Sequence, residues 1–255
     1  MIKEVLRASF KDFFSEKHSV ISYFASLFLY ELVYIIFLRV LFMKVPSFHG
    51  LGFYDVLCIF GMFQVVFSLF HLFFAYFIWF QEKYVWDRGL DVVLSMPINV
   101  IYYVTLLEIP GQIMEITGLV VGIIVFSIGA IGAGMGLGNI FLGLCIFIPI
   151  SLVIFTGFSL VLLSIGFIIY GRHTPFELFY EIAELGQYPV NLFPKILRVI
   201  FTYIFPLLQI ATLPYLMLKN FSFHKILFLL GAAFFWGMLG LWSFNNALKK
   251  YQSGG

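Results

Sequence analysis

The chain has 255 residues, 62% of them hydrophobic and 11% charged, with a formal net charge of +2. Soluble domains are roughly 45–50% apolar and ~25% charged, so a water-soluble fold would lack the polar residues to cover its surface. The small net charge gives no indication of a nucleic-acid partner, and the composition predicts an integral membrane protein in a lipid bilayer.

Residues 1–18 are expected to form an amphipathic helix in the cytoplasmic membrane interface. Apolar side chains from Ile2 to Phe14 recur at helical spacing, and charged side chains such as Lys3 and Arg7 fall on the opposite face. The segment lacks the apolar centre of a cleavable signal peptide. A frayed charged tail is the alternative interpretation.

Residues 19–250 are expected to form one domain of six transmembrane helices. About 20 apolar residues are needed to cross ~30 Å of hydrocarbon, and a backbone in lipid has to satisfy its own hydrogen bonds. The two-residue alternation of a membrane β-barrel is missing. The apolar runs of sufficient length are 19–43, 54–80, 100–131, 139–170, 197–219 and 226–247. The expected fold class is therefore an all-α integral membrane protein.

The third apolar run is interrupted near its start. Glu108, Pro110 and Glu115 disfavour a continuous span there. We therefore interpret 100–110 as an interfacial segment and place the start of the span near Gln112.

The distribution of Lys and Arg favours both termini in the cytoplasm. Residues 171–196 leave two alternatives open, a polar cytoplasmic loop or a short span followed by a re-entrant turn. With the loop, 11 of the 15 Lys and Arg residues lie inside. With the short span, Lys195 and Arg198 move outside and the ratio falls to 9 against 6. The cytoplasmic side stays the more basic one in both cases.

Four polar residues are expected inside the hydrocarbon region, where each costs free energy unless it is paired or hydrated. Gln64, Ser68 and His71 recur at helical spacing in the second span, and Glu31 lies near the middle of the first. One interpretation places them on a translocation path or at a permease interface. The other is ordinary hydrogen bonding between helices of one chain.

The sequence contains no recognisable catalytic, cofactor-binding or metal-binding site. It lacks the G-x-x-x-x-G-K-[ST] phosphate loop, the H-E-x-x-H zinc motif and any His pair at zinc-ligand spacing. Gly157-Phe158-Ser159 lacks the second glycine of a hydrolase nucleophile motif. We therefore expect a protein that is not an enzyme and uses no cofactor.

Residues 81–99 form the most informative connector, on the cytoplasmic side. Residues 91–94 are expected to form a short helical turn that Gly89 introduces and Pro97 ends, with Trp86 anchored at the interface. Such an element transmits force to a soluble partner. An ordinary interfacial connector is the alternative.

Three groups of residues resemble the permease subunits of type-2 ABC exporters, in the branch described as uncharacterised ABC-2 permeases. The first group is Gly89, Leu90, Asp91, Leu94, Pro97 and Ile98. The second is Tyr188, Pro189, Pro194, Leu197, Arg198, Pro206 and Pro214. The third is Tyr251, Ser253 and Gly254. The groups follow the family's order over essentially the whole chain, although Met96 stands where members often have arginine and Phe193 where many have tyrosine.

The resemblance implies the fold of these permeases and a coupling helix that docks on a separate ATPase subunit. The residues that would contact the ATPase or shape the coupling helix are Trp86, Arg88, Gly89, Leu90, Asp91, Leu94 and Pro97. A re-entrant segment is implied at 186–200, with its turn at Tyr188, Pro189 and Pro194, which favours the short-span alternative.

The resemblance further implies ATP-driven export, with a second permease, identical or related, completing the path. It places the chain as a multi-pass protein in the cell membrane, in a bacterium the inner membrane. Two other functions remain open, an ion-coupled secondary carrier that uses Glu31 and Glu115, and a membrane scaffold without transport. Nothing in the sequence identifies a substrate.

Overall fold

The structure, a computed structural model, describes residues 17–45, 47, 50–167, 175–189, 192–221 and 223–251. The amphipathic helix expected over 1–18 falls almost entirely outside these residues, as do Ser253 and Gly254. The described residues form helices and no strand, so the all-α fold class is confirmed.

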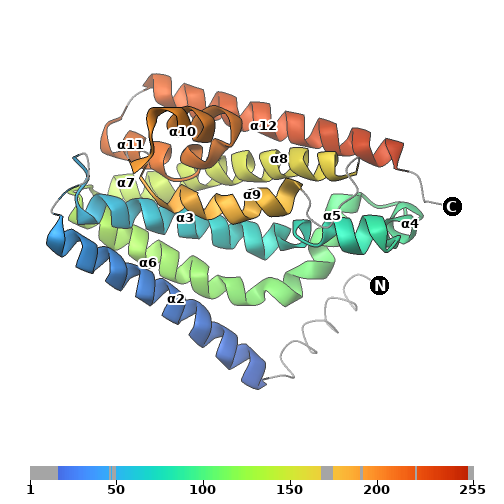
Figure 1. Ribbon diagram of the computed structural model, residues 1–255, viewed down its shortest axis with the longest axis horizontal. Coiled ribbons are helices and arrows are strands. Elements are labelled where there is room, and N and C mark those ends of the chain that lie inside the picture. The colour runs from blue at the N-terminus through green and yellow to red at the C-terminus, as the bar shows by residue number, and fades with distance from the viewer. Residues whose placement is uncertain are drawn as a thin grey trace.

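Five stretches of the described chain are long and apolar enough to cross a membrane. They are α2 (Lys17–Lys44), α3 (Phe53–Phe74) with its continuation to Trp86, η3 (Ile109–Glu115) with α6 (Ile116–Gly132), α7 (Leu137–Leu142) with η4 (Gly143–Phe147) and α8 (Ile148–Gly166), and α12 (Phe223–Lys250). They run lengthwise through one bundle, with α2 along its lower edge in Figure 1. The third span begins at Gln112, as expected from the interruption before it.

Shorter elements extend or connect these spans. Before η3 they are η1 (Ala75–Phe77), η2 (Gln81–Trp86), α4 (Gly89–Leu94) and α5 (Val100–Glu108). After α8 they are α9 (Pro175–Ala183), η5 (Glu184–Gln187), α10 (Lys195–Val199), η7 (Ile200–Ile204), η8 (Pro206–Gln209) and α11 (Thr212–Lys219).

The single span expected over 197–219 does not form one helix. That stretch is a hairpin in which α10 and η7 make one arm, and η8 and α11 make the other. The chain reverses at Phe205, whose backbone is extended because the ring of Pro206 disfavours helical geometry in the residue before it. Gln209 Nε2 donates to Thr202 O at 2.6 Å and joins the two arms. Hydropathy alone does not detect such a break, because both arms are apolar.

Helix α9 and η5 pack against two of the spans. They lie along α3 and α8 (Figure 1), and the Phe179 ring packs edge-on against Phe158 of α8, with 4.7 Å between centroids. This segment is not among the five stretches long enough to cross a membrane, so the short span and the cytoplasmic loop both stay predictions for 171–196. Tyr188 and Pro189 directly follow η5, and Pro194 directly precedes α10.

Two helix pairs pack backbone to backbone through glycines. A Cβ on Gly61 of α3 would lie 2.3 Å from Phe126 N of α6, and one on Gly240 of α12 would lie 2.3 Å from Gly157 O of α8. Small residues allow this close approach of helices in a membrane, where the hydrophobic effect does not drive their association. These two pairs form the rigid frame on which the remaining elements are placed.

Asp55 joins the beginning of α3 to the end of α11. Its carboxylate accepts hydrogen bonds from Lys219 Nζ at 2.6 Å, from the Tyr215 hydroxyl and from Gly52 N at 2.8 Å. Charge-assisted bonds are the stronger kind. They hold the returning arm of the hairpin against α3.

Candidate functional site

The first candidate site is the coupling segment, residues 81–99, at the same end of the bundle as the C-terminal end of α12 (Figure 1). A helical stretch of 34 residues, Phe53–Trp86, runs into this segment and forms its first six residues. At 1.5 Å per residue it is about 50 Å long. Since the hydrocarbon core is only ~30 Å thick, we expect the coupling segment to project into water.

A tight turn sets the direction of the coupling segment. Arg88 adopts the left-handed region with a φ of 59°, and a Cβ on Gly89 would lie 2.5 Å from Lys83 O. Only glycine fits at such a close approach to a backbone oxygen. The expected helical turn then follows as α4, and the Asn99 side chain accepts from Tyr102 N at 3.2 Å to start α5.

Helix α4 has a buried face and an exposed apolar face. Leu90 is 0% exposed and Val93 is 3% exposed, whereas Val92 is 60% and Leu94 is 45% exposed. Leu90 therefore shapes the segment and offers no surface to a partner. Of the other predicted coupling residues, Arg88 and Pro97 are exposed, and Trp86, Gly89 and Asp91 are partly buried.

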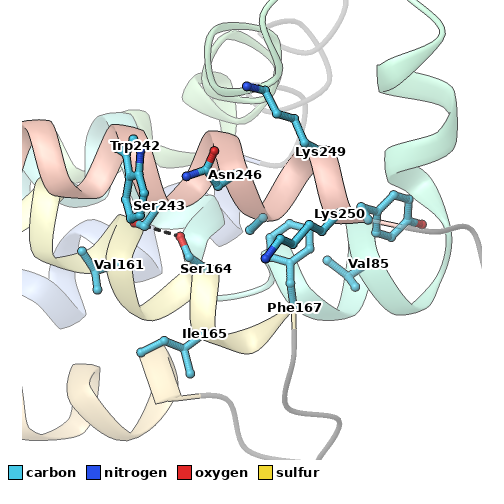
Figure 2. Close-up of a pocket in the computed structure, with 12 residues that line it drawn as sticks. Val85, Val161, Ser164, Ile165, Phe167, Trp242, Ser243, Asn246, Lys249 and Lys250 are labelled. Atoms are coloured by element: carbon cyan, nitrogen blue, oxygen red, sulfur yellow. Dashed lines mark hydrogen bonds between the residues drawn. The ribbon is translucent and has the colours of Figure 1, made fainter.

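A cavity lies next to the coupling segment. A cavity of about 770 Å³ opens between the ends of α8 and α12, and Val85 of η2 lines it (Figure 2). Ser164 of α8 and Ser243 of α12 face each other in Figure 2, with 3.2 Å between their hydroxyl oxygens. Gln81 Nε2 donates to Leu163 O of α8 at 2.8 Å. This hydrogen bond joins η2 to α8 beside the cavity.

The second candidate site is a polar cavity of about 150 Å³ within the bundle. Its polar lining residues come from α2, α3, η3 and η5 and are Glu31, Gln64, His71, Glu115, Glu184 and Gln187. The structure therefore brings together three of the four polar residues that the sequence singled out. Ser68 lies instead at the contact of α3 with α6, where its Oγ is 2.5 Å from the position of a Cβ on Gly118.

His71 is the centre of the contacts in the polar cavity. Its Nδ1 lies 3.4 Å from Glu115 Oε1, and its Nε2 is hydrogen bonded to the Tyr180 hydroxyl. Glu31 is 2% exposed, and its Oε2 has no hydrogen-bond partner among the described residues. The cavity thus combines a paired carboxylate with an unpaired carboxylate oxygen.

The contribution of α9 and η5 to this site is not among the predictions from the sequence. Tyr180, Glu184 and Gln187 reach the cavity region from this segment, at the same i, i+4 and i+7 spacing as the polar stripe of α3. That spacing is the signal that identifies them. It was passed over because the polarity of 171–196 allowed a loop outside the membrane.

The polar cavity has the chemistry of a binding site. Its carboxylates lie beside the rings of Phe63 and Phe67, whose centroids are 5.1 Å apart. Within the described residues, no group of three or more His, Cys, Asp or Glu side chains is placed to hold a metal ion. What the cavity offers a ligand is electrostatic attraction in a region shielded from water.

The family model described as ABC-2 family transporter protein matches residues 28–255. No curated protein and no solved structure matches the chain.

Proposed function

The chain belongs to the ABC-2 family of transporter proteins, and we propose that it is the permease subunit of an ATP-driven exporter coupled to a separate ATPase. The observation that carries this proposal is the exposed apolar face of α4. Val92 and Leu94 are directed away from the bundle, at the end of a helix too long for the hydrocarbon core. Apolar side chains exposed in water mark a site of contact with another protein.

The proposal assigns the cytoplasm to the end of the bundle that holds the coupling segment. Lys83 and Arg88 of that segment and Lys249 and Lys250 of α12 are basic residues close to the ends of spans. The bias of such residues towards the cytoplasm supports this orientation. It also puts α4 on the side where ATP is available.

ATP binding and hydrolysis on the partner would move α4, and the hydrogen bond between Gln81 and Leu163 would pass that movement to α8. Packed helices switch between discrete arrangements as rigid bodies, and ligands bias the balance between them. One chain supplies half of a transport path. A second permease, either another copy or a related chain, completes it in the cell membrane.

The test is a photo-crosslinking residue at position 92, introduced into the full chain in native membranes, with captured proteins identified by mass spectrometry. We expect capture of a nucleotide-binding subunit. The matched control is position 137, where Leu137 is 78% exposed at the opposite end of the bundle. Equal capture of the ATPase from both positions, or none from position 92, would contradict the proposal.

An ion-coupled carrier is the second candidate function, because the polar cavity holds Glu31 and Glu115 in one buried site. Carboxylates at this depth are typical of proton relays. Vesicles that contain the chain and no ATPase distinguish the two functions. A carrier would move its substrate in response to a pH or sodium gradient, whereas the proposed permease would stay inactive until the ATPase and ATP are added.

A further inference from the structure

The polar cavity has an excess of acidic side chains. Glu31, Glu115 and Glu184 line it, and among its described lining residues His71 is the one basic side chain. His71 already lies 3.4 Å from Glu115 and is hydrogen bonded to Tyr180. The charge of the site is therefore not balanced by its own lining.

The buried oxygen of Glu31 is an independent sign of a missing partner. Glu31 lies near the middle of α2, is 2% exposed, and its Oε2 makes no hydrogen bond within the described residues. Buried polar groups are nearly always paired, and an unpaired one costs about 1–3 kcal/mol or more. An ionisable residue inside a membrane-spanning segment, with a buried oxygen left unpaired, is a candidate for ligand binding.

Aromatic rings also line or border the cavity, together with Leu27, Gln64 and Gln187. Phe67 stacks on Tyr180, with 5.5 Å between ring centroids, and its centroid lies 4.5 Å from that of His71. Phe63 and Tyr30 also line the cavity. The negative faces of aromatic rings attract cations, and more strongly when the site is desolvated. Carboxylates and rings therefore favour the same class of ligand.

We propose that the polar cavity binds the ammonium group of a cationic organic substrate, with Glu31 as its counter-ion. The inference rests on the proposed transport function and names the class of substrate. A volume of about 150 Å³ admits only a small group, since one water occupies about 30 Å³. The ammonium end of the substrate occupies the cavity, and the remainder lies outside it.

The test measures binding to the purified full chain in phosphatidylcholine nanodiscs, without ATPase. The probe is radiolabelled phenethylammonium, and the competitor of matched shape is neutral 2-phenylethanol. We expect saturable binding that excess unlabelled phenethylammonium displaces and 2-phenylethanol does not. Displacement by both compounds at equal concentration would overturn the proposal, because the site would then recognise the ring and not the charge.

Substitutions of single glutamates test which carboxylate the binding of phenethylammonium requires. Glu31→Gln keeps the size of the side chain, and we expect binding at least tenfold weaker, with Glu115→Gln also weaker. The control Glu181→Gln changes an exposed carboxylate of α9 outside the cavity lining and should bind as the parent does. Unchanged binding in Glu31→Gln would overturn the proposal.

A stability measurement separates lost binding from lost folding. Because Glu31→Gln replaces a buried carboxyl group, whose Oε2 has no hydrogen-bond partner among the described residues, with an amide of the same size, its thermal midpoint should equal or exceed that of the parent. If Glu31→Gln were to unfold, Glu184→Gln, which changes an exposed carboxylate at the rim of the cavity, would replace it in the test. We expect Glu184→Gln to weaken binding of phenethylammonium about two- to fivefold. Unchanged binding in that variant would refute the site. Crosslinking of the ATPase from position 92 does not depend on these results, so either hypothesis can fail alone.

Discussion

Neighbouring residues of α4 have opposite exposures, so single substitutions there separate stability from partner binding. Leu90→Ala empties a fully buried site and should lower the free energy of unfolding by about 2–5 kcal/mol. Val92→Asp changes an exposed side chain and should alter the free energy of unfolding by no more than about 0.5 kcal/mol, while abolishing co-purification of the ATPase. Thermal unfolding in detergent and affinity purification measure the two effects. Loss of the ATPase in a stable Leu90→Ala variant would contradict this division of roles.

At the scale of single residues, the sequence indicates which side chains are unusual for their position, but not which other residues they contact. Glu31, Gln64 and His71 stood out because polar side chains are costly inside apolar runs, and the structure places all three around one cavity. Leu90 was predicted either to contact the ATPase or to shape the coupling helix, because the coupling motif does not distinguish the faces of a six-residue helix. Burial depends on which elements pack against α4, and a local pattern does not contain that information.

Among the elements, the link between η2 and α8 has a testable geometry. A Cβ on Gly166 would lie 2.1 Å from Gln81 Nε2, so Gly166→Ala displaces the amide and breaks its hydrogen bond to Leu163 O. An unsatisfied buried amide costs about 1–3 kcal/mol. We expect backbone amides of residues 81–94 to exchange with deuterium about 5- to 150-fold faster, because the coupling segment opens more readily. Hydrogen-exchange mass spectrometry of the full chain measures this.

The control for that substitution has the opposite expected sign. Gly231 lies in α12 with no atom within 4 Å of the position of its Cβ. Gly231→Ala should therefore stabilise the helix by about 0.5–1 kcal/mol and leave exchange in the coupling segment unchanged. Equal effects of the two alanines would mean that Gly166 acts through helix propensity and not through Gln81.

At the scale of elements, hydropathy predicts some helix boundaries and not others. Pro110 and its acidic neighbours allowed the start of the third span to be placed at Gln112, because proline and charge interrupt a run visibly. The hairpin at Phe205 escaped prediction, since Pro206 is flanked by apolar residues on both sides. A proline in a membrane run predicts either a kink or a reversal, and the choice depends on tertiary contacts such as that of Gln209 with Thr202.

For the whole molecule, the path of the chain through the bilayer distinguishes the hairpin from a single span. In the structure Lys195 is the first residue of the hairpin, and Asn220 directly follows its last residue. Helices α10 and α11 lie in the same half of the bundle (Figure 1). A cytoplasmic loop over 171–196 would instead put Lys195 on the opposite side of the membrane from Asn220. Cysteines at the two positions, in a background with Cys58 and Cys145 replaced by alanine, should both react with a membrane-impermeant maleimide from outside the cell.

A cysteine at Lys249, near the end of α12, serves as the inside marker and should react only in inverted vesicles. The expectation follows from the distribution of basic residues, because moving Lys195 and Arg198 outside still leaves the end with the coupling segment more basic. If position 195 reacts only in inverted vesicles and 220 only from outside, the hairpin is wrong and 197–219 crosses the membrane. If all three positions exchange sides, the fold stands and the coupling segment faces outward, where no ATP-driven partner is available to it.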